Sequence, residues 1–68
     1  MNISVNGESH NVPENCSAKT LVEILNMQND KIAMEVNREI VPRSQYDDFT
    51  FSENDQIEIV RAIGGGQL

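Results

Sequence analysis

The stretch QIEIVRAI, residues 56–63, constrains the fold more than any other part of the sequence. Ile57 and Ile59 fall on one face of an extended strand, and Val60 and Ala62 fall on the other, because side chains alternate along a strand. This density of β-branched residues favours a strand. A strand that is apolar on both faces fits the interior of a sheet. The sequence therefore predicts a sheet whose last strand lies at its centre.

The N-terminal segment predicts a β-hairpin. Ile3 and Val5 alternate with polar residues and lead into Asn6-Gly7, a pair that tolerates the positive φ angles of a tight turn. The returning strand is expected over residues 10–12. Pro13 ends this strand because it has no backbone N–H to donate.

One helix is expected, from Ala18 to Met27. Ser17 precedes it as the N-cap, since its hydroxyl can accept a hydrogen bond from the N–H of Thr20. Apolar residues at positions i, i+3 and i+4 predict the face that packs on the sheet. These residues are Leu21, Ile24 and Leu25.

Two more strands follow the helix, one over residues 32–36 and a short one at Ile40-Val41. Residues 42–49 lack alternation and predict an irregular segment or a single turn, with Tyr46 and Phe49 packed inward. The element order is then strand, strand, helix, strand, short strand, strand. This order predicts an α+β fold of the β-grasp (ubiquitin-like) type, with a mixed sheet of four to five strands and one main helix.

Composition limits the classes of partner. The 68 residues include eleven acidic and five basic side chains, giving a formal net charge of −6. Nucleic-acid binding needs clustered Lys and Arg, so it is not expected, whereas a partner with a basic surface suits this charge. No apolar run approaches the ~20 residues of a membrane span. The N-terminus also lacks a signal-peptide pattern. We expect a cytoplasmic monomer.

The residues that usually carry catalysis are few and scattered. The chain has one His, one Cys and one Tyr, namely His10, Cys16 and Tyr46 in separate segments. They provide no zinc-ligand set and no converging catalytic group. Asp47 and Asp48 are expected to be solvated acidic residues of a loop. Cys16 is expected to be an ordinary loop or cap residue. The chain is predicted not to be an enzyme and to bind no metal or cofactor.

Three glycines, Gly64-Gly65-Gly66, follow the last predicted strand. Glycine costs the most conformational entropy to order, so residues 64–68 predict a flexible tail beyond a domain over residues 1–63. Glycines also accumulate at termini without a role. The functional interpretation is that a tail without side chains enters a narrow channel in another protein. There a glycine carboxylate is unhindered for activation by ATP and attack by sulfur.

Two motifs resemble one known family. The stretch VNREIVPRSQY (residues 36–46) and the stretch DQIEIVRAIGGG (residues 55–66) are similar to the ThiS family of sulfur carriers. The resemblance covers essentially the whole chain in length, element order and both motifs. It departs at Asn54, where the family commonly has glycine, but Asn tolerates the same positive φ.

The resemblance implies a carrier that holds sulfur as a C-terminal thiocarboxylate. Gly65 and Gly66 correspond to the family's diglycine, with the Gly66 carboxylate as the reacting group. A ThiF-type adenylyltransferase would activate it with ATP, a persulfide source would supply sulfur, and thiazole synthase (ThiG) would receive that sulfur for the thiamin thiazole ring.

The resemblance also places a partner surface at the end of the last strand. Its residues would be Val60, Ala62, Ile63 and Gly64, although packing of Val60 in the core is an equal alternative. Arg43 and Arg61 either position acidic groups of a partner or are plain surface charges.

Gln67-Leu68 depart from the family, because a carbonyl in a peptide bond cannot be adenylated. A JAMM-type metalloprotease could trim these residues, they could remain from cloning, or the protein could act by binding alone. Trimming favours a related carrier for methionine or another sulfur-containing metabolite. The small subunit of molybdopterin synthase is a further relative. A non-covalent ubiquitin-like binding module is the alternative from another class.

Overall fold

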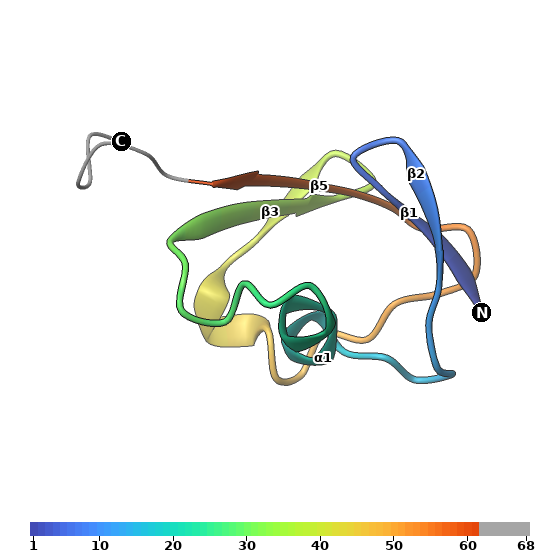
Figure 1. Cartoon of the computed structure of the whole chain (residues 1–68), viewed down its shortest axis with the longest axis horizontal. Coiled ribbons are helices and arrows are strands. Elements are labelled where there is room, and N and C mark those ends of the chain that lie inside the picture. Colours follow the sequence, from blue (N-terminus) through green and yellow to red (C-terminus); the bar gives the residue numbers. More distant parts are fainter. Residues whose placement is uncertain (62–68) are drawn as a thin grey trace.

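The computed structural model describes residues 1–61, which form a five-stranded mixed sheet with one α-helix across one face (Figure 1). This architecture confirms the predicted α+β, β-grasp fold. The elements in chain order are β1 (Asn2–Val5), β2 (Glu8–Asn11), α1 (Ala18–Ile24), β3 (Ile32–Val36), β4 (Glu39–Val41), the 3-10 helix η1 (Arg43–Gln45) and β5 (Gln56–Arg61).

The strand order is β2-β1-β5-β3-β4, so β5 lies at the centre as predicted. β5 runs parallel to β1 and antiparallel to β3, and the two outer pairs are antiparallel hairpins. Ile57 is in register with Val5 on one side and with Val36 on the other. β5 therefore joins the two hairpins into one sheet.

Both hairpins turn through residues with positive φ. Asn6 and Gly7 have φ angles of 52° and 84° between β1 and β2, which confirms the predicted turn. Asn37 and Arg38, at 51° and 72°, form the corresponding turn between β3 and β4. Asn54 has a φ of 69°, the conformation in which Asn substitutes well for glycine.

The helix starts as predicted and ends early. The N–H of Thr20 donates to the Ser17 hydroxyl over 3.1 Å, and α1 stops at Ile24 rather than at Met27. The prediction that Ile24 packs inward is wrong, because its side chain is 51% exposed. The inward stripe begins one turn earlier and follows the spacing i, i+3, i+4, i+7. Its members are Ala18, Leu21, Val22 and the partly buried Leu25.

The core lies between α1 and the sheet. Its fully buried large side chains are Leu21, Met34 and Ile57. Tyr46 is buried as predicted, whereas Phe49 is only partly buried. The unpredicted core aromatic is Phe51, 5% exposed, whose ring meets that of Phe49 edge-on with centroids 5.7 Å apart.

Candidate functional site

The end of β5 is the candidate site, because it leads directly into the glycine segment. Ile57 and Ile59 point into the core, while Val60 is 60% exposed on the other face. The alternative of a core role for Val60 is therefore excluded. The other predicted site residues, Ala62, Ile63, Gly64, Gly65 and Gly66, lie outside the described residues.

Two arginines near this end have partners within the chain. The Arg61 guanidinium forms a salt bridge with the Asp30 carboxylate, with an N–O distance of 3.0 Å. Arg43 donates to the backbone carbonyl of Asp30 over 2.7 Å and lies over the Tyr46 ring, 5.8 Å from its centroid. Both guanidiniums thus tie the loop before β3 to neighbouring elements.

Asn6 contacts β5 through its side chain. Its Oδ1 accepts from the N–H of Ile59 over 2.8 Å, and its Nδ2 donates to the carbonyl of Ile59 over 3.2 Å. The sequence predicted Asn6 only as a turn residue. Nothing in the local pattern indicated a contact 53 residues away.

The face of the sheet opposite α1 combines exposed apolar and acidic side chains. Ala33 is in register with Val60, and Ile40, the most exposed large apolar residue described, is 73% exposed on β4. Glu35 and Glu58 are in register across β3 and β5. Within residues 1–61 neither glutamate has a basic side chain within salt-bridge distance. Like charges opposite each other destabilise a sheet, so this face suits a basic partner group.

The scattered polar residues do not form a catalytic set in the described part of the chain. Cys16 is buried, and this burial raises the pKa of its thiol above the ordinary value. Burial likewise raises the pKa of Tyr46, and the nearby Arg43 partly opposes this. His10 lies on β2, and Asp47 and Asp48 are exposed. Residues 1–61 contain no group of three or more His, Cys, Asp or Glu arranged for a metal ion.

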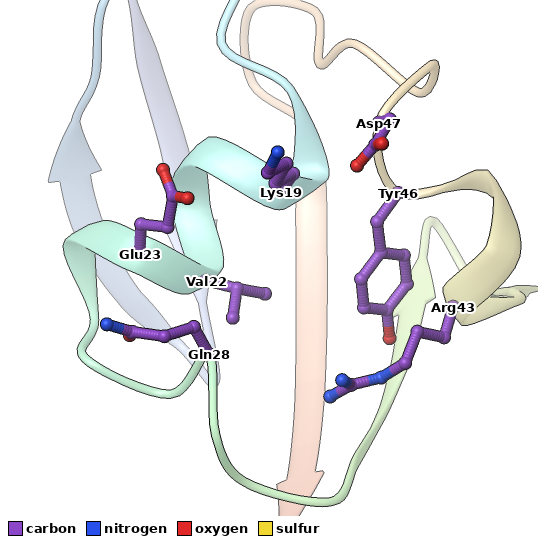
Figure 2. Close-up of a pocket in the computed structure, with 7 residues that line it drawn as sticks. All are labelled: Lys19, Val22, Glu23, Gln28, Arg43, Tyr46 and Asp47. Carbon is purple, nitrogen blue, oxygen red and sulfur yellow. The ribbon is translucent and has the colours of Figure 1, made fainter.

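A pocket of about 200 Å³ lies between α1 and η1 (Figure 2). In this view the Tyr46 ring and the Arg43 side chain lie across from Val22 of the helix, whose side chain points toward them. The lining mixes both signs of charge, and its residues are Lys19, Val22, Glu23, Gln28, Arg43, Tyr46 and Asp47. This pocket is on the helix side of the sheet, away from the outward face of Val60.

The profile of the ThiS family matches residues 2–66, nearly the whole chain. The chain belongs to the ThiS family. This is the family of sulfur carriers that the two motifs predict. The crystal structure of the thiamine biosynthesis protein (ThiS) from Geobacter metallireducens has a TM-score of 0.82 and 30% identity. That comparison covers 97% of this chain and all of the Geobacter chain.

Larger relatives contain a segment of this kind. The chain is 40% identical over 67 residues to a thiazole synthase of Magnetococcus marinus, covering 98% of this chain and 21% of that protein. It is 38% identical to a thiazole synthase of Paramagnetospirillum magneticum, covering 97% of this chain and 20% of that protein. It therefore spans about a fifth of the length of these relatives. An uncharacterized protein, ycf40, of Porphyra purpurea is 30% identical, covering 97% of this chain and 93% of that protein.

Within residues 1–61, no helix has the length and apolar character needed to cross a bilayer.

Proposed function

We propose that this chain carries sulfur for the thiazole ring of thiamin as a thiocarboxylate on Gly66. The observation that supports this most is the match to two thiazole synthases, each of which contains a ThiS-like segment in its own polypeptide. Covalent linkage of two proteins raises the effective concentration of each for the other. A carrier segment joined to thiazole synthase fits an enzyme that takes sulfur from that segment.

The proposed chemistry begins at the Gly66 carboxylate, once the peptide bond between Gly66 and Gln67 has been hydrolysed. A carboxylate oxygen attacks the α-phosphorus of ATP on a ThiF-type enzyme, and pyrophosphate leaves. The terminal sulfur of a persulfide then attacks the acyl carbon, AMP leaves, and reduction of the acyl disulfide by a thiol releases the thiocarboxylate. Gly65 and Gly66 suit these steps because they present no side chain to a narrow active site.

The domain division follows the same proposal. On this proposal residues 1–63 act as the handle and residues 64–68 as the tail, of which Gly64-Gly65-Gly66 enters the partner once Gln67-Leu68 have been removed. Val60 begins the docking surface and Ala62, Ile63 and Gly64 continue it toward the diglycine. A basic partner group facing Glu35 and Glu58 would remove the repulsion between these two carboxylates.

The test uses two chains, residues 1–66 and residues 1–68, each incubated with a ThiF-type enzyme and ATP. The shorter chain should support exchange of pyrophosphate into ATP. After addition of a persulfide donor and a thiol, its intact mass should rise by the difference between sulfur and oxygen. The longer chain should do neither until it is trimmed. A 1–66 chain inert to ATP would contradict the proposal.

Gly66→Ala in the 1–66 chain tests the need for an unhindered terminus. It should fold normally, because the buried side chains of residues 1–61 lie between Ile3 and Ile59, and it should be adenylated more slowly. Full adenylation of this variant would contradict the narrow-channel argument. Adding thiazole synthase to the thiocarboxylated chain then identifies the acceptor. A thiocarboxylate that thiazole synthase leaves intact would point instead to methionine or another sulfur-containing metabolite, with a JAMM-type protease releasing Gly66.

A further inference from the structure

β5 extends beyond the strand that pairs with it on one side. The N–H of Asn6 donates to the carbonyl of Ile57 over 2.9 Å, continuing the parallel ladder between β1 and β5. β1 ends at Val5, and positive φ angles at Asn6 and Gly7 then direct the chain away into β2. The backbone of the first hairpin is therefore no longer available to the next ladder position of β5, which is Ile59.

The carboxamide of Asn6 takes both hydrogen bonds at that position. It accepts from the N–H of Ile59 over 2.8 Å and donates to the carbonyl of Ile59 over 3.2 Å. In a continued ladder the backbone carbonyl of residue 6 and the N–H of residue 8 would make these bonds. A carboxamide carries the same donor and acceptor as a peptide group. The Asn6 side chain thus lengthens the ladder after its own backbone has turned away.

This contact lies at the base of the reacting segment. On its other side Ile59 is in register with Met34 of β3, so Ile59 has partners in both neighbouring segments of the sheet. Beyond Ile59, in the part of the chain that the structure describes, β5 pairs only with β3 and is tied to Asp30 through Arg61. Within residues 1–61, Asn6 therefore provides the last hydrogen bonds from the β1 side along β5.

We propose that Asn6 is a positioning residue for the reaction at Gly66, because its carboxamide sets the point and direction at which the chain leaves the sheet. This role rests on the proposed carrier function. The seven residues from Val60 to Gly66 span at most about 25 Å, so once a partner channel holds this segment extended, a rotation of about 10° at Ile59 moves the carboxylate by up to about 4 Å. A misplacement of an ångström is already costly at a reacting centre.

The variant Asn6→Gly removes the carboxamide and keeps the turn, because glycine adopts positive φ readily. Asn37→Gly is a matched control at the other end of β5. Asn37 also lies in a hairpin turn, with a φ of 51°. Its Oδ1 accepts from the N–H of Gln56 over 3.0 Å, and its Nδ2 donates to the Asp55 carboxylate over 3.0 Å. Both variants lose two side-chain hydrogen bonds, but only Asn6→Gly loses them at the end of β5 that leads to the glycine segment.

Two measurements separate positioning from general destabilisation. Amide hydrogen exchange by NMR on the 68-residue chain should be about tenfold faster at Ile59 in Asn6→Gly, and within about twofold of wild type there in Asn37→Gly. Steady-state activation of the 1–66 chains by a ThiF-type enzyme should show KM for the carrier raised about five- to tenfold in Asn6→Gly alone. Urea unfolding should show that both variants fold.

An unchanged rate of amide exchange at Ile59 in Asn6→Gly would refute the role of the Asn6 carboxamide in holding Ile59. Equal changes of KM in the two variants would reduce Asn6 to a structural residue, and an unchanged KM would refute its positioning role. A wild-type 1–66 chain that is not activated would instead refute the carrier function on which this role depends. The exchange measurement needs no partner enzyme, so the two failures are distinguishable.

Discussion

Replacing Val60 by alanine separates partner docking from folding. The change removes two methyl groups, each worth about 0.8 kcal/mol when fully buried. Because 60% of Val60 is exposed in the free domain, about 1 kcal/mol remains to be gained when a partner covers it. Val60→Ala should therefore raise the Kd for a ThiF-type enzyme about fivefold, measured by isothermal titration calorimetry. The free energy of unfolding should change by less than about 1 kcal/mol, the full range of strand propensities.

Ile24→Ala is the matched control for this prediction. Ile24 is also a half-exposed apolar residue, at 51%, but it lies on α1, which covers the opposite face of the sheet (Figure 1). Its truncation should leave the Kd unchanged. Equal binding by Val60→Ala and wild type would refute the assignment of the outward face of β5 to docking. Equal weakening by both truncations would show that docking is not confined to that face.

Three further predictions each concern a single side chain. Ser17→Ala removes the acceptor for the N–H of Thr20 and should lower the free energy of unfolding by about 1 kcal/mol in urea titrations; no loss would mean that water caps α1 equally well. Glu58→Lys places opposite charges in register with Glu35, so stability should rise by about 0.2–1 kcal/mol while binding to the activating enzyme weakens; tighter binding would refute a basic partner group. Burial raises the pKa of Cys16, so the native thiol should react with iodoacetamide more slowly than the unfolded one. For the same reason the free energy of unfolding should fall as pH rises above about 8.5, where the unfolded thiol ionises first; a stability that rises over that range would contradict the shift.

The parts of the fold that local chemistry decides were predictable. Asn6-Gly7 encodes its turn through backbone freedom, and Ser17 encodes the helix start through its hydroxyl. The central place of β5 followed from its apolar alternation, since inward Ile57 and outward Val60 lie on opposite faces. Each of these features depends on a few neighbouring residues.

Features that depend on distant packing were not predictable. Ile24 and Val22 differ by two positions on a seven-residue helix, and only the angle of α1 on the sheet decides which is buried. Phe51 takes the inner place expected for Phe49 because the chain after η1 bends back toward Cys16, whose carbonyl accepts from the N–H of Phe51. The two hydrogen bonds between the Asn6 carboxamide and the Ile59 backbone likewise form only when β5 is inserted beside β1.

The insertion of β5 between β1 and β3 has a consequence for synthesis of the protein. Until residues 56–61 have left the ribosome, the two hairpins have no strand to join them, and Ile57 is missing from the core. A nascent or interrupted chain that ends before Gln56 should therefore stay unfolded and open to proteolysis. A folded copy therefore always includes the base of the glycine segment, and protein quality control would keep chains that end before Gln56 from competing for a partner.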